Sequence, residues 1–399
     1  MVIIGAGECG TRAALTLRED GCAGPITLVG AETGDPYERP PLSKPDPDAP
    51  PRRVSVATAA RLADLNIDFR PGRAADRIDR TARAVHLGDG TVLAFNKLLL
   101  ATGAKPRRLS IPGEHHATTF RDVDDARRLF AGPSCRVTLV GAGLIGLELA
   151  AALRLRGHSV TVLEASDRAL GRSVPADLAA RIVARHRQAG VDLRFGAAVS
   201  AIEADAVILG DGTRVPSDTH VVAIGVVPET ALAEAAGLAI ENGIIVDATL
   251  RTADPDIYAA GDCAVADHPL YGRHLRIETW RNAQDQGIAA ARNMLGATAP
   301  FTRVPWFWSD HFDFGLQVAG LPDEGTLTIT RETGPDAAIL FSLAPEGRLV
   351  AASGLGPGNA VARDVRLSGM LIERGASPDT ASLADPGIGL KSLLRAAGS

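Results

Sequence analysis

The sequence predicts an α/β protein with two Rossmann-like dinucleotide-binding domains, one nested in the other, followed by a C-terminal α+β domain. A glycine-rich motif occurs twice, as GAGECG at residues 5–10 and as GAGLIG at residues 141–146. Each copy follows a short apolar strand and opens an apolar helix, the context that such a motif needs to bind a pyrophosphate. From about Trp306 the pattern changes to short strands backed by one helix, which predicts the third domain.

The first motif predicts a nucleotide site at the start of the chain. A strand at residues 2–4 leads into a turn where the backbone can approach a pyrophosphate, whose charge the amide groups of a helix at residues 8–19 would hold. The glycines of this turn are Gly5, Gly7 and Gly10. Glu32 follows the next strand, where a carboxylate accepts ribose hydroxyls; a solvated acid is the alternative. Because a pyrophosphate repels a carboxylate, we expect Glu8 to point outward.

The second motif repeats this pattern between a strand at residues 136–140 and a helix at residues 144–154. Its residues are Gly141, Gly143, Leu144, Ile145 and Gly146. Glu164 follows the next strand and would accept both ribose hydroxyls while repelling a 2′-phosphate. The second site should therefore prefer NADH over NADPH, although Arg168, four residues later, weakens that argument.

The rest of the chain supplies further strands and helices. We expect a strand that returns from one domain to the other near residues 97–103, an antiparallel excursion at 199–225, a strand and a following helix on either side of Asp262, and a helix at 282–295. In the C-terminal domain we expect strands at residues 315–320, 326–330, 338–343 and 348–352, and a helix at 359–374.

Charge and cysteine usage exclude several classes of function. The formal net charge of −5 gives no general attraction to nucleic acids or anionic membranes. No two of the four cysteines are separated by only two residues, so a redox CxxC motif and a metal-binding knuckle are disfavoured. We therefore expect no metal site. A core strand begins at residue 2 and leaves no room for a signal peptide, which predicts a cytoplasmic protein.

A larger set of motifs resembles a known family. The motifs are GAGECG, PYERPPLSK (36–44), LLLATGAKPR (98–107), GAGLIGLELA (141–150), AIGVVPE (223–229), YAAGDCA (258–264), RIETWRNAQDQG (276–287) and VPWFWSD (304–310). Over essentially its whole length the chain resembles the FAD- and NADH-dependent ferredoxin reductases of bacterial oxygenase systems, which have a glutathione-reductase-like fold. The resemblance implies FAD on residues 1–106 and 232–304, NADH on residues 107–231, and a C-terminal domain at residues 305–399 that closes over the flavin.

The resemblance also assigns residues to the cofactors. It places Lys44 beside the N5 and O4 edge of the flavin, Asp262 at a ribityl hydroxyl, and Trp280 at the start of a helix that faces the flavin pyrimidine. Cys9 and Ala75 match positions that approach FAD through backbone atoms. Arg121 matches a residue that contacts FAD in the family, and Arg39 and Gly225 are further candidate cofactor-binding residues.

Glu148 and two tryptophans are the candidate catalytic residues besides Lys44. Glu148 stands in an otherwise apolar helix, and because a buried acid needs a partner we predict a Lys44–Glu148 pair at the hydride-transfer site. The alternative for Glu148 is an acid favoured by the helix dipole. On the resemblance, Trp306 and Trp308 shield the flavin and line the exit for electrons; ordinary core packing is the alternative.

The predicted function is hydride transfer from NADH to FAD, followed by single-electron transfer to a [2Fe–2S] ferredoxin that serves a Rieske oxygenase or a cytochrome P450. The alternatives are a rubredoxin or quinone-type reductase, and a slow redox-sensing flavoprotein related to apoptosis-inducing factor. For ferredoxin docking we nominate a basic patch of Arg39, Lys44, Arg52 and Arg53, with ordinary solvated charge as the alternative. The sequence leaves open whether the protein is a monomer or a homodimer.

Overall fold

The structure is a computed structural model that describes residues 1–171 and 173–397. Its internal contacts divide the chain into two compact units. Unit 1 comprises residues 1–39, 53–105 and 226–303, and unit 2 comprises residues 40–52, 106–225 and 304–399. Each unit contains one of the two glycine motifs.

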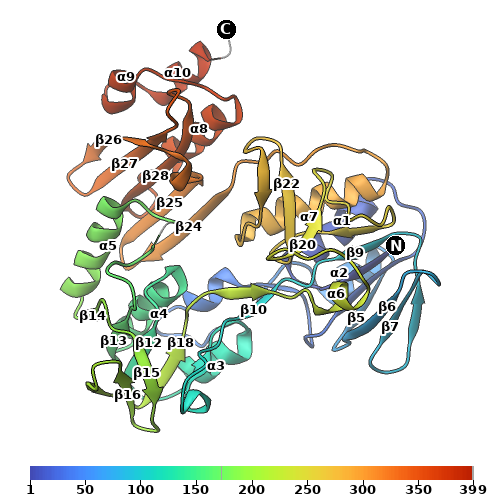
Figure 1. Cartoon of the computed structure of the whole chain (residues 1–399), viewed down its shortest axis with the longest axis horizontal. Helices are drawn as coiled ribbons and strands as arrows, with labels where there is room; N and C mark the ends of the chain where they lie inside the picture. Colours follow the sequence, from blue (N-terminus) through green and yellow to red (C-terminus); the bar gives the residue numbers. More distant parts are fainter. Residues whose placement is uncertain (172, 398–399) are drawn as a thin grey trace. The chain divides into compact units, whose positions relative to one another are not determined.

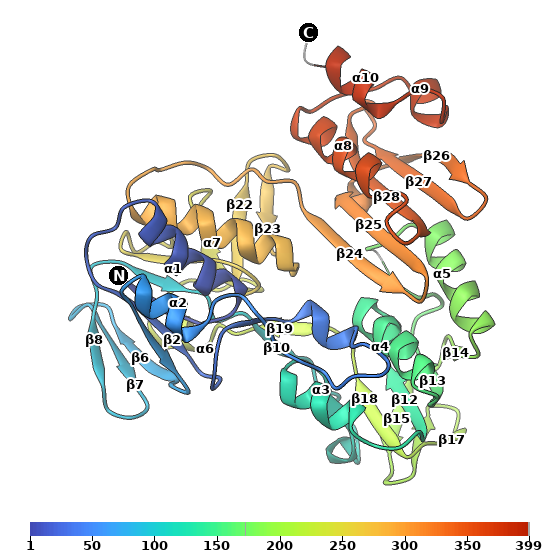
Figure 2. The ribbon, with the colours of Figure 1, turned by 180° about the vertical axis from the view of Figure 1, so that it is seen from behind.

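Unit 1 is built on a parallel sheet whose strands stand in the order β21-β9-β1-β2-β5. The strands are β1 (Val2–Ile4), β2 (Ile26–Gly30), β5 (Ile67–Pro71), β9 (Leu98–Leu100) and β21 (Ile257–Ala259). Helices α1 (Glu8–Glu19) and α7 (Trp280–Met294) lie side by side against this sheet (Figures 1 and 2). A Cβ atom on Gly287 would overlap the carbonyl oxygen of Cys9, so the two helices approach closely because residue 287 has no side chain.

Smaller elements complete unit 1. The antiparallel sheet β6-β7-β8 consists of β6 (Ala75–Asp79), β7 (Ala84–Leu87) and β8 (Val92–Ala94), and a second small sheet consists of β20 (Ile244–Val246), β22 (Ala264–His268) and β23 (Arg273–Leu275). The pair β3 (Tyr37–Glu38) with β4 (Val54–Ser55), the pair β10 (Ala104–Pro106) with β19 (Val226–Pro228), and helices α2 (Ala59–Asp64) and α6 (Ala231–Ala235) are the remaining pieces.

Unit 2 holds a second parallel sheet, with the order β11-β18-β12-β13-β14. Its strands are β11 (Thr118–Thr119), β12 (Arg136–Val140), β13 (Ser159–Leu163), β14 (Asp192–Arg194) and β18 (Thr219–Val222). Its helices are α3 (Val123–Phe130), α4 (Leu144–Leu155) and α5 (Ala176–Gln188). The predicted excursion is the antiparallel sheet of β15 (Val199–Ile202), β16 (Ala206–Leu209) and β17 (Arg214–Pro216), after which β18 rejoins the parallel sheet.

The C-terminal segment of unit 2 is α+β, as predicted. Its antiparallel sheet has the order β24-β25-β28-β27-β26, with β24 (Trp306–His311), β25 (Phe314–Gly320), β26 (Leu327–Gly334), β27 (Ala337–Leu343) and β28 (Leu349–Pro357). Helix α8 (Ala362–Glu373) packs on this sheet, and α9 (Thr380–Ala384) and α10 (Leu390–Ala396) follow (Figure 1). Strand β28 continues five residues beyond the predicted end at residue 352, because its small residues pair on both sides inside the sheet.

Two local predictions were wrong. Asp262 begins no helix, because the chain turns there and enters β22 at Ala264. Helix α7 begins at Trp280, as the resemblance implied but two residues before the start predicted from the sequence pattern, because the Thr279 side chain accepts a hydrogen bond from the amide of Asn282 and caps the helix.

Candidate functional site

The two glycine motifs form backbone turns of the same geometry. Gly5 and Gly141 both have a φ of +108°, a conformation that favours glycine. In each motif a Cβ atom on the third glycine, Gly10 or Gly146, would overlap the carbonyl oxygen of the first. These contacts fix each helix against its strand, the close packing that a dinucleotide turn requires.

The middle glycine of each motif faces open space. Apart from the adjacent residues of the chain, no atom of the described residues lies within 4 Å of the place where a Cβ would stand on Gly7 or Gly143. Gly7 and Gly143 are also the N-caps of α1 and α4, and glycine has no side chain to satisfy the first amides of these helices. Both turns therefore fit a pyrophosphate, which the helix amides and the helix dipole would hold.

Glu164 is fixed at the second turn. Its Oε2 atom accepts a hydrogen bond from the Ala142 amide at 2.8 Å, and its Oε1 atom accepts one from the Ser166 amide at 2.9 Å. The carboxylate therefore stands beside the glycine motif, as a ribose acceptor must. Arg168 donates to the carbonyl oxygen of Val174 at 3.2 Å.

Glu32 lies in a bend just after β2. Its carboxylate accepts hydrogen bonds from the Tyr37 hydroxyl and from Arg39, both at 2.5 Å. The Glu32 carboxylate thus orients the Arg39 guanidinium, and both of these candidate cofactor-binding residues belong to unit 1.

The prediction for Glu8 was wrong. Its side chain is only 7% exposed, and its Oε1 atom accepts from Arg12 at 2.8 Å and from Gln284 at 3.1 Å. The repulsion argument ignored these partners, one of which lies four residues along α1 and the other on α7. The paired guanidinium offsets the negative charge, so the acid is tolerated beside the turn.

The predicted pair of Lys44 and Glu148 is present in unit 2. The Lys44 ammonium lies 3.3 Å from Oε1 of Glu148 and 2.8 Å from Oδ2 of Asp310. Glu148 is 5% exposed, and it also accepts hydrogen bonds from the hydroxyls of Ser43 at 2.5 Å and Ser309 at 2.6 Å. We call these five residues the lysine–carboxylate cluster. Lys44 itself follows a short 3₁₀ helix, Pro40–Ser43.

Strand β24 contributes to this cluster from both of its faces, because side chains alternate along a strand. Trp306, Trp308 and Asp310 alternate with Phe307, Ser309 and His311. The rings of Trp306 and Trp308 stack with centroids 5.4 Å apart, and the Lys44 ammonium lies 4.9 Å from the centre of the Trp308 ring. Both tryptophans are half-buried, so they are neither fully packed core nor free surface.

The other assigned residues occupy both units. In unit 1, Ala75 begins β6, Asp262 lies in the turn before β22, and Trp280 begins α7. In unit 2, Arg121 precedes α3, where its amide donates to Asp125 at 2.8 Å, and Gly225 is exposed with a φ of +94°.

Two of the four thiols are buried where they are poorly suited to redox chemistry. All four cysteines are free, and Cys9 and Cys263 are buried. Burial raises the pKa of both thiols, that of Cys9 well above its ordinary value. A buried thiol that stays protonated is a poor nucleophile.

Sequence reasoning missed Ser43, Ser309 and Asp310 as members of the cluster. All three belong to the motifs RPPLSK and WFWSD: Ser43 and Ser309 are each next to a candidate residue, and Asp310 is two residues from Trp308. The two serines bind Glu148 on α4, which is 105 positions away along the chain from Ser43, and Asp310 binds Lys44.

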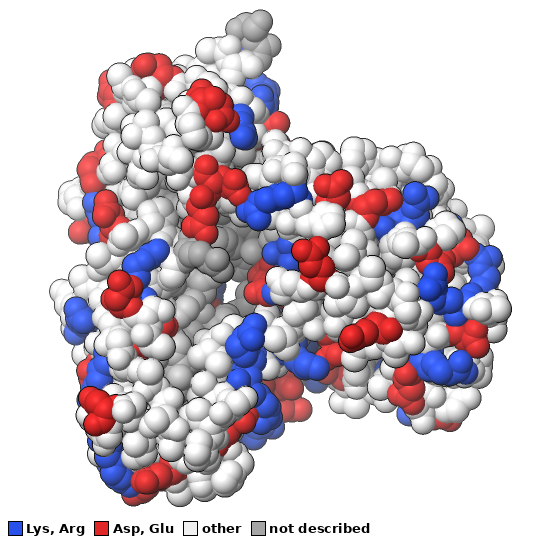
Figure 3. Space-filling view, in the orientation of Figure 1, with Lys and Arg blue, Asp and Glu red and all other residues white. Residues whose placement is uncertain are grey.

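Three residues of the nominated basic patch already have partners. Arg39 pairs with Glu32, Lys44 pairs with two carboxylates, and Arg53 donates to the Thr33 carbonyl at 2.7 Å. Arg52 is exposed and makes no hydrogen bond or ion pair with any described residue. On the face drawn in Figure 3, basic and acidic side chains alternate without a large region of one sign.

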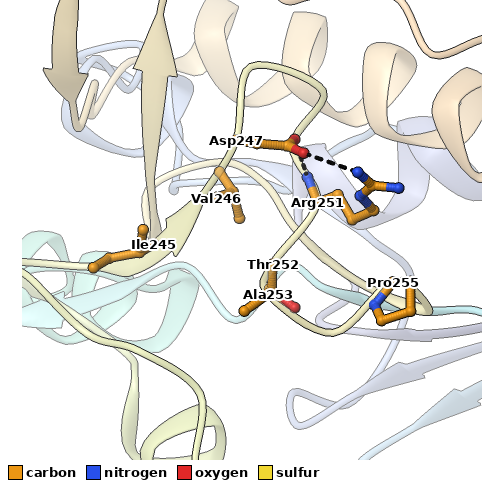
Figure 4. Close-up of a pocket in the computed structure, with 7 residues that line it drawn as sticks. All are labelled: Ile245, Val246, Asp247, Arg251, Thr252, Ala253 and Pro255. Carbon is orange, nitrogen blue, oxygen red and sulfur yellow. Dashed lines mark hydrogen bonds and ion pairs between the residues drawn. The ribbon is translucent and has the colours of Figure 1, made fainter.

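A surface pocket in unit 1 contains none of the candidate residues. It is lined by Ile245, Val246, Asp247, Arg251, Thr252, Ala253 and Pro255, with Asp247 bonded to Arg251 (Figure 4). Across the described residues, no helix is both long and apolar enough to cross a bilayer.

Two dinucleotide turns on one chain, with a lysine–carboxylate cluster in place of a reactive thiol, define a pyridine-nucleotide-dependent flavoprotein reductase. The family model "Pyridine nucleotide-disulphide oxidoreductase" matches residues 1–287, and "Reductase C-terminal" matches residues 306–394. The ferredoxin–NAD(+) reductase component of the anthranilate 1,2-dioxygenase system of Burkholderia cepacia is 41% identical over 98% of both chains.

Solved structures agree with this match. The covalent complex of putidaredoxin reductase with putidaredoxin gives a TM-score of 0.94 at 33% identity, covering 100% of this chain and 98% of that one. A ferredoxin reductase from Rhodopseudomonas palustris gives 0.92 at 32% identity, covering 98% and 99%. The chain belongs to the pyridine nucleotide-disulphide oxidoreductase family and, within it, to the ferredoxin–NAD(+) reductases. The predicted fold class is confirmed.

Proposed function

We propose that this protein is the NADH-dependent ferredoxin reductase of an oxygenase system. It takes a hydride from NADH onto FAD and passes single electrons to a [2Fe–2S] ferredoxin, which serves a Rieske oxygenase or a cytochrome P450. The observation that carries the proposal is the pair of equivalent dinucleotide turns, one in each unit, on a chain whose two buried cysteines have raised pKa values.

FAD, when bound, converts a two-electron hydride into two single electrons. The residues proposed to hold it are Gly5, Gly7, Cys9, Gly10, Glu32, Arg39, Lys44, Ala75, Arg121, Asp262 and Trp280. The first turn supports this assignment, because Gly7 leaves its helix amides open to a phosphate. Residues 1–106 and 232–304 are the proposed FAD-binding domain, and residues 305–399 the proposed C-terminal domain.

The NADH site is proposed at the second turn, within residues 107–231. Gly141, Gly143, Leu144, Ile145, Gly146, Glu164 and Gly225 would form it. Two backbone amides fix the Glu164 carboxylate. A carboxylate at the ribose would repel the 2′-phosphate of NADPH, so NADH is the proposed donor.

The lysine–carboxylate cluster is proposed to orient the reactants of hydride transfer. Lys44 would supply a positive charge to stabilise a reduced, more negative flavin. Glu148, whose Oε1 atom lies 3.3 Å from the ammonium, would keep it in position. The stacked pair of Trp306 and Trp308 would shield the flavin from water and line the route by which electrons leave.

The ferredoxin is proposed to dock through local basic charge, with Arg52 as the first contributor because no described carboxylate neutralises it. The reductase is proposed to work in the cytoplasm, where its four free cysteines would remain reduced.

One experiment separates the proposed function from its alternatives. Purified protein reconstituted with FAD is given NADH and cytochrome c, with a [2Fe–2S] ferredoxin, a rubredoxin, a quinone or no mediator added. Fast reduction that requires the ferredoxin supports the proposal. Equal or faster turnover with the rubredoxin or the quinone would contradict it, and slow turnover under every condition would point to a redox sensor.

A further inference from the structure

The Glu148 carboxylate is held by more donors than an ion pair needs. Its two oxygens accept from the hydroxyl of Ser43 on one side and from the hydroxyl of Ser309 on the other, besides the Lys44 ammonium. Ser43 is 1% exposed and Ser309 is 0% exposed, so water does not compete for these bonds. All four residues belong to unit 2, but they come from three separate stretches of the chain.

The protons of this network can be counted. Each serine hydroxyl has one proton to donate, and an ionised carboxylate only accepts. Three donors converge on Glu148, which suits a carboxylate without a proton of its own. Hydrogen bonds to an ionised group are about twice as strong as neutral ones, so the two serines fix both the charge and the plane of the carboxylate.

The position of the Lys44 ammonium depends on how firmly the Glu148 carboxylate is held. Its ammonium is shared between buried Glu148 and Asp310, whose side chain is 50% exposed. If Glu148 could rotate, the ammonium would be free to follow the exposed partner toward solvent. A fixed Glu148 keeps the positive charge on the inner side of the cluster.

We infer that Ser309 and Ser43 are positioning residues for hydride transfer, which clamp the Glu148 carboxylate so that the Lys44 ammonium is held in one place. The inference rests on the proposed function for the step from NADH to FAD and is independent of the electron acceptor. It assigns a task to two serines through Glu148 and not through contact with either cofactor.

The test uses the FAD-loaded variants Ser309→Ala and Ser43→Ala, with Ser353→Ala as the matched control. Ser353 is a fully buried serine of the same antiparallel sheet as Ser309, and its hydroxyl has no hydrogen-bond partner among the described residues. Flavin reduction by NADH is followed by stopped flow. We expect each test variant to reduce flavin about 10-fold more slowly, the effect of one hydrogen bond to a charged group, and the control to match the wild type.

A double-variant comparison separates positioning from general damage. In a Glu148→Gln background, Ser309→Ala should change the rate less than about 2-fold, because the charge on which it acts is already absent. An equal loss in both backgrounds would overturn the inference. Should Ser309→Ala fail to fold, Ser43→Ala in the otherwise unchanged protein still tests the inference, through the flavin-reduction rate and through the measurement below.

A readout without NADH tests the position of Lys44 directly. We expect an amine-reactive reagent, with peptide mass spectrometry, to modify Lys44 several-fold faster in both test variants than in the wild type or in Ser353→Ala. Unchanged modification rates would also overturn the inference. Failure of the ferredoxin assay with the wild-type protein would contradict the proposed function and leave these measurements unaffected.

Discussion

The Nε2 atom of His186 on α5 lies 3.3 Å from the Nδ1 atom of His311 on β24, and both imidazoles are fully buried. Whichever tautomer carries the shared proton, the outer nitrogen of each ring, His186 Nδ1 and His311 Nε2, has no hydrogen-bond partner among the described residues. The pair thus joins helix α5 to the antiparallel sheet of unit 2, and its burial disfavours a charged ring.

This pair predicts a loss of stability in mild acid. Burial, aided by the Arg185 charge, lowers the pKa of His186 from 6.5 to about 4, and burial lowers that of His311 well below its ordinary value. Between pH 6.5 and 4 the histidines are protonated in the unfolded chain but stay neutral in the folded chain. The free energy of unfolding therefore falls as the pH falls toward 4. For His186 alone the loss is about 2 kcal/mol at pH 5.

Urea unfolding at pH 7 and pH 5 measures this effect. His186→Phe should reduce the difference between the two pH values, since phenylalanine keeps the edge contact with Phe312 and cannot be protonated. His115→Gln, at an exposed position, is the control and should leave the difference unchanged. A difference as large in His186→Phe as in the wild type would show that the pair is not responsible.

Glu148→Gln should slow flavin reduction by NADH by at least about 10-fold without loss of bound FAD. The glutamine fits because its amide can donate to Ser43, whose own proton can turn to the Pro40 carbonyl oxygen 3.3 Å away. Stopped-flow absorbance gives the rate, and the flavin-to-protein ratio gives the FAD content. Wild-type rates in this variant would make the Lys44–Glu148 pair structural.

Asp310→Asn should raise the reduction potential of the bound flavin. The cluster now sets two carboxylates against one ammonium, and removing the exposed one leaves more positive charge to favour the reduced, negative ring. Because Asp310 is half exposed, we expect a change of roughly 10 to 20 mV, measured by dye-coupled titration. A lower potential would mean that Lys44 does not face the flavin.

Glu164→Gln should relax the preference for NADH. The glutamine can still accept from one of the two amides that now bind the carboxylate, but it no longer repels a 2′-phosphate. We expect the ratio of kcat/KM for NADPH to that for NADH to rise roughly 10- to 100-fold. Arg168→Ala is the companion variant. With NADH it should behave like the wild type, because the Arg168 side chain is bound to the Val174 carbonyl oxygen and is not needed for NADH.

Arg331→Lys should destabilise the end of the chain. Arg331 is 2% exposed and donates to the carbonyl oxygens of Ser382, Leu383 and Ile388, which a single ammonium cannot reach in the same fork. We expect a loss of about 3 kcal/mol and faster proteolysis after residue 379. Arg348→Lys, an exposed pair with Glu346, should change neither.

The sequence was sufficient for the parts of the fold that repeat local patterns. Both glycine turns, the strands before them and the helices after them are where the motifs predicted, because these features depend on a few adjacent residues. The Lys44–Glu148 pair was also predictable, since a lone acid in an apolar helix must find a cation.

Long-range packing explains what was missed. Glu8 was predicted to point outward because Gln284, its partner on α7, lies 276 positions later in the chain. The serines that bind Glu148 look like ordinary polar residues in their motifs, and only the packing of β24 against α4 gives Ser309 its acceptor. Likewise, the histidine pair joins residues 125 positions apart.

The missing side chain at residue 287 has an effect beyond the two helices that it brings together. Trp280 begins the same helix, two turns before Gly287. Its position therefore depends on how closely Gly287 packs against α1. A single added methyl group would act as a wedge between α1 and α7 and would tilt the tryptophan without touching it. The distance between α7 and α1, the helix that follows the first nucleotide turn, therefore depends partly on Gly287, a residue without a side chain.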